Sequence, residues 1–230
     1  MQKKLALDKA ALVLSSKATP VLFLDTCVML DIFRLVERAD SFTPFKFYLQ
    51  LVDRIKNGDV CVVYNETVEK EYSYNAANVV REQRAKIKNL NNKWNALRSM
   101  KEKKDVSHKI ELSADKIIHS AETTLRYIQQ NALIIKDYDA ALWSSYDVVL
   151  RHVAPATRES QFKDACIFKT CMDLGKKSGR EIVFCTTNTK DYCDDTKKNV
   201  HPDIKSQADA NNVVVALNLG DAYGHMFHPL

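Results

Sequence analysis

The sequence VLFLDTCVMLD, residues 21–31, places a carboxylate at the tip of a run of apolar residues. Val21 to Leu24 predict a buried strand, Asp25 follows directly, and apolar residues resume at Val28. Burying a carboxylate without a partner is unfavourable by several kcal/mol or more. We therefore expect a chemical partner for Asp25 at the end of this strand.

Short apolar strands alternate with helical patterns along the rest of the chain. This alternation predicts an α/β fold, a Rossmann-like three-layer sandwich in which helices cover both faces of a central parallel sheet. One domain is expected over residues 1–230, with a helical insertion at about 76–155, where no strand pattern is found. Strands are predicted at 21–25, 60–64, 181–186 and 213–217, and helices at 5–16, 28–38, 44–56, 66–104, 110–131, 137–152 and 161–177.

Composition indicates a globular protein of the cytoplasm. The chain has 46% hydrophobic and 27% charged residues, and no apolar run approaches the ~18 residues of a membrane span. Near the N-terminus, Asp8 and Lys9 interrupt the apolar stretch that a signal peptide would need. The six cysteines form no Cys-x-x-Cys pair and are predicted to be reduced structural thiols.

One segment carries the positive charge of the chain. Between positions 81 and 109 there are ten Lys or Arg and three acids, a net charge of +7, whereas the whole chain carries +5. Arg81, Arg84 and Lys88 recur at helical spacing and could contact phosphates, and Trp94 could stack on a base. The alternative is a solvated helix face with Trp94 packed inward.

Polar side chains follow three predicted strands or open a helix. Asp25 ends the first strand, Glu71 lies in the helix after the second, and Asp164 lies in the first turn of a later helix. Asn188 and Asp191 follow the third strand. Because ligands in such sheets bind beyond the carboxyl ends of the strands, we expect these side chains to meet.

Clustered carboxylates repel one another unless a cation lies among them. Oxygen ligands without Cys or His favour Mg²⁺ or Mn²⁺, and such an ion can promote phosphodiester hydrolysis. A metal is therefore the expected partner of Asp25.

Other polar residues have simpler interpretations. Glu66 and Glu69 are expected to be helix caps or surface charges. The stretch GKKS at 175–178 lacks the first glycine of a phosphate loop and is interpreted as a helix C-terminus. Loop charges are predicted at Asp194, Asp195 and Asp203, and a loose C-terminus at His225 and His228.

Four blocks resemble the PIN-domain nucleases. They are VLFLDTCVMLD with Asp25, NETVEKEY with Glu71, KDACIF with Asp164, and FCTTNTKDY with Asn188 and Asp191, in the order of that family. Cys27 stands where relatives often carry Asn, and Asn188 stands where many carry a fourth Asp.

The resemblance implies an Mg²⁺- or Mn²⁺-dependent phosphodiester hydrolase that cleaves RNA, and we expect an endoribonuclease. The sequence does not distinguish RNA from single-stranded DNA as the substrate. We expect Asp25 and Asp164 to hold the principal metal, and Glu71 either to bind that metal through a water molecule or to position the attacking water. Asn188 or Asp191 would complete the metal shell, with Asp191 counted among the catalytic residues. An inhibitory protein partner, as in toxin–antitoxin pairs, and a homodimer are further expectations.

Two other functions remain open at this stage. A phosphatase of the haloacid-dehalogenase type also begins with an aspartate after its first strand, but its second Asp would stand at Cys27. A catalytically decayed PIN-like module that binds nucleic acid or a protein partner is the second alternative. Metal-dependent turnover would distinguish an enzyme from such a module.

Overall fold

A computed structural model describes residues 4–34, 43–101, 112–156 and 161–228. Its strands form one parallel sheet in the order β1-β4-β3-β2-β5-β6, which confirms the predicted α/β class. The strands are β1 (Lys4–Leu5), β2 (Val21–Leu24), β3 (Cys61–Asn65), β4 (Leu133–Ile135), β5 (Ile182–Cys185) and β6 (Val213–Ala216).

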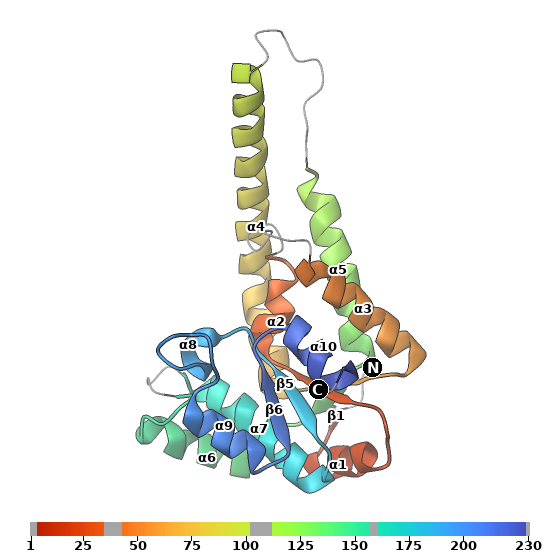
Figure 1. The fold of residues 1–230 in the computed structure, drawn as a ribbon, viewed down its shortest axis with the longest axis vertical. Helices are drawn as coiled ribbons and strands as arrows, with labels where there is room; N and C mark the ends of the chain where they lie inside the picture. The colour runs from red at the N-terminus through yellow and green to blue at the C-terminus, as the bar shows by residue number, and fades with distance from the viewer. Residues whose placement is uncertain (1–3, 35–42, 102–111, 157–160, 229–230) are drawn as a thin grey trace.

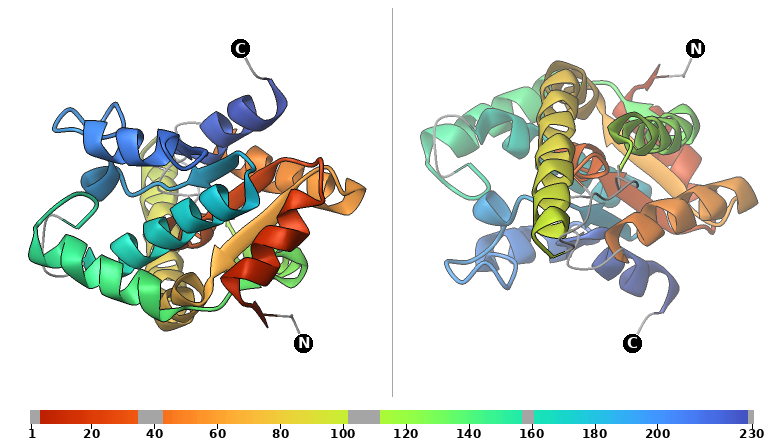
Figure 2. Two further views of the ribbon diagram at one scale, coloured as in Figure 1. Left: turned by 90° about the horizontal axis from the view of Figure 1, so that it is seen from below. Right: turned by 90° about the horizontal axis from the view of Figure 1, so that it is seen from above.

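Helices cover both faces of this sheet (Figures 1 and 2). On one face α1, α6 and α7 pack together, and on the other α3 packs against both α5 and α10. The helices are α1 (Leu7–Ser15), α2 (Thr26–Asp31), α3 (Thr43–Asn57), α4 (Glu66–Lys101), α5 (Ala114–Asn131), α6 (Asp139–Leu150), α7 (Phe162–Ser178), α8 (Thr189–Tyr192), α9 (Pro202–Asp209) and α10 (Leu219–Phe227). No described helix combines the length and apolarity that a membrane span requires.

The chain leaves the two central strands in opposite directions. From β2 it passes to β3, and from β5 it passes to β6 on the other side of the sheet. Parallel connections are right-handed, so these two crossovers lie on opposite faces and leave a crevice between the ends of β2 and β5. The fold therefore places its ligand-binding position where Asp25 follows β2.

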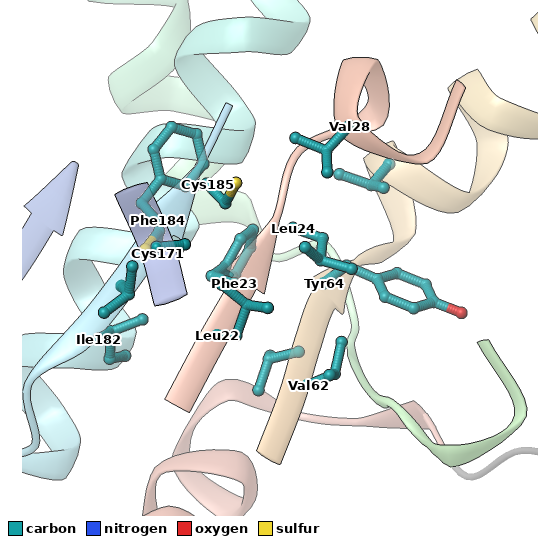
Figure 3. Packing of buried hydrophobic residues seen from close by; sticks show 14 of the residues in the cluster. Leu22, Phe23, Leu24, Val28, Val62, Tyr64, Cys171, Ile182, Phe184 and Cys185 are labelled. Carbon is teal, nitrogen blue, oxygen red and sulfur yellow. The ribbon is translucent and has the colours of Figure 1, made fainter. Parts of the chain in front are cut away.

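The core lies around β2 and β5, whose residues are all buried (Figure 3). The ring of Phe184 contacts those of Phe23, Phe168 and Tyr192, with centroids 5.9, 5.5 and 5.4 Å away. Tyr192 belongs to α8, and its hydroxyl donates to the carbonyl of Asp164 at 3.0 Å. This packing fixes α8 and the start of α7 against the sheet, beside the end of β5.

Two strands were not predicted. β4 lies between β1 and β3, inside the segment 76–155 that was expected to contain no strand. That expectation was wrong because β4 has only three residues, too few to display a strand pattern. The apolar residues Leu133 to Ile135 could equally belong to the end of a helix. β1 has only two residues, and the predicted helix 5–16 begins after it, at Leu7.

The polypeptide after β5 is more helical than predicted. Asp203 lies in the first turn of α9 and His225 in the last turn of α10, so neither belongs to the loop or loose tail expected there. The helix expected at 28–38 is shorter, since α2 ends at Asp31, and positions 35–42 lie outside the described residues.

The end of α7 confirms the interpretation of GKKS as a helix terminus. α7 ends at Ser178, and Gly179 follows in the left-handed conformation with φ of 63°. A Cβ added to Gly175 would lie 2.3 Å from the carbonyl oxygen of Asn211, so glycine is needed there for close packing. The six cysteines are free thiols, as predicted.

α4 and α5 together form an arm that projects from the sheet (Figure 1). With 36 residues, α4 is about 54 Å long at 1.5 Å per residue. Gln83 and Ile87 of α4 are fully buried, and Ile118 and Leu125 of α5 are at most 2% exposed. One continuous helix thus begins at the carboxyl end of β3 and ends far from the sheet.

Candidate active site

Asp25 accepts hydrogen bonds from residues that follow both central strands. It is 2% exposed and caps α2, because its Oδ1 accepts from the backbone N–H of Thr26 at 2.6 Å. Its Oδ2 accepts from the Thr186 hydroxyl at 2.6 Å and from the Cys27 thiol at 2.9 Å. Burial raises the pKa of Asp25, and these hydrogen bonds act in the opposite direction.

Cys27 links the ends of β2 and β5. Its Sγ accepts from the backbone N–H of Thr187 at 3.0 Å and lies 3.3 Å from the Thr186 hydroxyl oxygen. Burial, and then the charge of Asp25, raise the pKa of this thiol well above its ordinary value. The thiol therefore stays protonated and can donate to Asp25, a role that the sequence comparison with Asn at this position did not indicate.

Asp164 lies in the first turn of α7, close enough to the other acids to be affected by their charges. Its pKa is raised from 3.8 to about 7, first by burial and then by the charges of Asp25, Asp191 and Glu71. The structure thus brings these four predicted acids into one electrostatic cluster. Their mutual repulsion is the property that a bound cation would relieve.

Asn188 bridges two of these acids through its amide nitrogen. Nδ2 donates to Asp191 Oδ2 at 2.8 Å and to Asp164 Oδ1 at 3.2 Å. The amide of Gln161, a residue that is 5% exposed, also donates to Asp191. Asn188 separates the two carboxylates without adding charge, and its own Oδ1 is the atom that could bind a metal.

Glu71 approaches the cluster from the second turn of α4. Its Oε2 accepts from the Thr26 hydroxyl at 2.8 Å, and its Oε1 lies 3.4 Å from Lys163 Nζ. The side chain is 23% exposed, so Glu71 reaches solvent, as do the partly exposed Asp164 and Asp191, whereas Asp25 is buried. Glu69, in contrast, pairs with Lys4 at 2.6 Å, as expected for a residue outside the site.

A buried acid that the sequence analysis did not select lies beside the site. Asp31 is 5% exposed, accepts from the Thr187 hydroxyl at 2.6 Å and lies 3.3 Å from Arg34. Asp31 lies six residues after Asp25, inside the apolar stretch VMLDIF. A charged residue within such a stretch could have identified it as a candidate from the sequence. Through this hydrogen bond, Asp31 holds Thr187 in the segment that follows β5.

The oxygen atoms of the site suit a hard cation, but the described acidic side chains do not surround a common point where one could bind. Asp25, Glu71, Asp164, Asn188 and Asp191 supply only oxygen atoms to a metal, as Mg²⁺ and Mn²⁺ prefer. Among the described residues, no three His, Cys, Asp or Glu side chains form a group that could hold a metal ion. Asp25 already accepts three hydrogen bonds and has about one acceptor position left.

Arg81, Arg84 and Lys88 lie within about 60° of one another around α4, as their spacing predicted, whereas Trp94 lies on another side of the helix. Arg84 forms an ion pair with Asp115 of α5 at 2.7 Å, whereas Lys88 is exposed and Arg81 bonds to Asn78 of the same helix. Trp94 is 52% exposed, so it is not packed inward. At 100° per residue, Trp94 lies about 120° around the helix from Lys88.

The fold and the site define an α/β protein with an acidic cluster at the switch point of a parallel sheet. A family model described as PIN domain matches residues 22–192, most of the chain, and this range includes every acid of the cluster. The chain belongs to the PIN domain family, as its sequence motifs indicated. No curated protein and no solved structure matches it. PIN domains are generally nucleases that act on nucleic acids and usually use divalent metal ions.

Proposed function

We propose that this chain is an Mg²⁺- or Mn²⁺-dependent endoribonuclease of the cytoplasm. The observation that carries the proposal is the gathering of four carboxylates at the switch point, where Asn188 joins Asp164 to Asp191 and Thr26 joins Glu71 to the end of β2. Burial and the other three carboxylates raise the pKa of Asp164 to about 7. Repulsion of this kind destabilises the metal-free site and favours a dication. When bound, the ion would withdraw negative charge from the scissile phosphate and activate water.

Each residue of the site has a proposed role. Asp25 and Asp164 would hold the ion, with Asn188 Oδ1 or Asp191 completing its shell. Glu71 would orient the attacking water and accept its proton, because it has a route to solvent and is steered by Thr26. The Asn188 and Gln161 amides donate to Asp191 and hold its carboxylate beside Asp164.

The arm would extend the contact with RNA. Glu71 and Lys88 lie on the same helix, 17 residues or about 25 Å apart along its axis. A strand of RNA that binds both must therefore continue well beyond the scissile bond. Arg81 and Lys88 are the proposed phosphate contacts. Arg84 would contribute less, because it already forms an ion pair with Asp115. Trp94 would contact only an RNA strand that winds around α4.

The test is cleavage of a mixed RNA pool by purified protein with Mn²⁺ and with EDTA. We expect Mn²⁺-dependent fragments from the wild-type protein and none from Asp25→Asn or Asp164→Asn. Asp173→Asn is the matched control, because it removes a carboxylate of the same helix that binds Lys169 and Tyr138 away from the acidic cluster. Cleavage by Asp164→Asn at the wild-type rate would disprove the assignment. Single-stranded DNA in a parallel reaction distinguishes the two substrates.

A specific observation also favours the second candidate, a decayed module that binds nucleic acid or a protein. No described group of three acids is closed enough to hold a metal, and Asn188 adds no charge. Such a module would bind RNA in EDTA as well as in Mn²⁺, cut none of it, and give no Mn²⁺ binding by calorimetry. If Asn188→Asp then restored both Mn²⁺ binding and cleavage, this candidate would be preferred. An inhibitory protein partner and a homodimer remain proposals for solution measurements.

A further inference from the structure

Three exposed apolar side chains lie near the far end of α4. Leu90, Trp94 and Leu97 are 41%, 52% and 62% exposed, and we name them the arm-tip stripe. Their spacing of four and three residues puts them on one face of the helix. Fully buried Ile87 is seven residues before Trp94 and shares that face. The stripe therefore continues the surface by which α4 packs against α5.

The contact between the two helices ends before the stripe does. Asn91 Nδ2 donates to the carbonyl of Leu112, and the N–H of Leu112 donates to Asn91 Oδ1, both at 3.0 Å. From Asn91, α4 continues to Lys101 for about 15 Å. Within the described ranges, Trp94 and Leu97 keep more than half of their surface exposed. Contiguous exposed apolar side chains of this kind mark interaction surfaces.

The charged residues of α4 beside the stripe, at positions 88–98, are all basic. From Lys88 to Arg98 the sequence KNLNNKWNALR has three basic residues and no acid. A second copy of the arm would bring like charges together, which disfavours self-pairing. Leucine side chains give nucleotides nothing to stack on, whereas anchors at four- and three-residue spacing are typical of helix–helix docking.

We propose that the arm-tip stripe binds an acidic amphipathic helix of another protein. Leu90, Trp94 and Leu97 would contact the apolar face of that helix, and Lys93 would meet its acidic flank. The same face of α4 already accepts α5 nearer the sheet, so docking would extend an existing helix pair. This surface is separate from the acidic cluster and does not depend on nuclease activity.

The stripe contains one of only two tryptophans in the chain, which gives a direct readout. Trp143→Phe changes an exposed residue of α6 and leaves Trp94 as the sole tryptophan. The probe is a synthetic four-heptad helix with Leu at the core positions and Glu on both flanks. Its matched control has the same core and Lys on the flanks. We expect a saturable blue shift of Trp94 emission with the Glu-flanked peptide and none with the Lys-flanked peptide.

Two substitutions distinguish specific docking on the stripe from nonspecific hydrophobic binding. Leu97→Glu in the Trp143→Phe background should weaken binding of the Glu-flanked peptide at least about tenfold, a loss typical of an interface anchor. Leu12→Glu, at a leucine of α1 that is 72% exposed, should leave it unchanged. Circular dichroism confirms that each variant is folded.

Several outcomes would overturn the proposal. Equal binding of both peptides, or no binding of either, would refute the charge argument. A blue shift that grows with protein concentration alone would assign the stripe to a second copy. A shift produced by RNA and lost in Leu97→Glu would assign it to nucleic acid instead.

Discussion

Asp164→Asn is expected to stabilise the metal-free protein at pH 8. Burial and the charges of Asp25, Asp191 and Glu71 raise the pKa of Asp164 from 3.8 to about 7. Between these values the folded state keeps a proton that the unfolded state releases, so the free energy of unfolding falls as the pH rises. At about 1.4 kcal/mol per pKa unit, the whole loss is about 4 kcal/mol as an upper bound.

The substitution removes this loss while keeping the local hydrogen bond. An asparagine Oδ1 at position 164 can still accept from Asn188 Nδ2, which lies 3.2 Å from Asp164 Oδ1. The difference in stability between variant and wild type should therefore be smallest below the ordinary pKa of 3.8. It should grow up to about pH 7 and stay constant above that value.

Urea unfolding at pH 4, 6 and 8 in EDTA measures this difference. Mn²⁺ should then raise the stability of the wild-type protein at pH 8 more than that of Asp164→Asn. Asp173→Asn, the control on the same helix, should lose stability at pH 8, because it gives up an ion pair with Lys169. A variant at position 164 that is no more stable than wild type at pH 8, or a difference that does not change with pH, would refute the reasoning.

Three further results are expected. Asn188→Asp replaces the hydrogen-bond donor between Asp164 and Asp191 by a negative charge. The free energy of unfolding of the metal-free protein, measured with urea, should therefore fall by about 1–3 kcal/mol. Mn²⁺ should bind more tightly in calorimetry, and weaker binding would contradict this prediction. Reversing the charges of Arg81 and Lys88 should weaken RNA binding and lower its salt slope by about 2, and an unchanged slope would remove them from the interface. Ile87→Ala should destabilise the arm by about 2–4 kcal/mol, seen as faster hydrogen exchange in α4 and α5 but not in β2; uniform acceleration would mean that the arm does not unfold separately.

The sequence by itself determined the α/β class, the central strands and the acids that follow them. These features are local: an apolar run such as Val21 to Leu24 can be recognised without its neighbours, and so can a carboxylate directly after it. The basic segment and the long helix that begins at Glu66 were also predicted, because charge and helix propensity add up along the chain.

Only the tertiary structure decided how these local features are paired. β4 is a strand because β1 and β3 lie on either side of it, and three residues alone do not specify that state. Arg84 has its partner on another helix, and Trp94 is exposed on the arm, where the sequence alone also allowed it to pack inward. Periodicity in one segment says nothing about which element lies opposite.

The site illustrates the same limit. The sequence named Asp25 but not the groups that make its burial tolerable, because Thr186 is 161 residues away along the chain and meets it only where β2 and β5 pair. Asn188 as a metal ligand stays a prediction. What the sequence did not show is that its amide nitrogen bridges Asp164 and Asp191, which come from different helices. Hydrogen-bond partners are set by distance in space, and the fold alone brings residues so far apart in sequence to within 3 Å or so of one another.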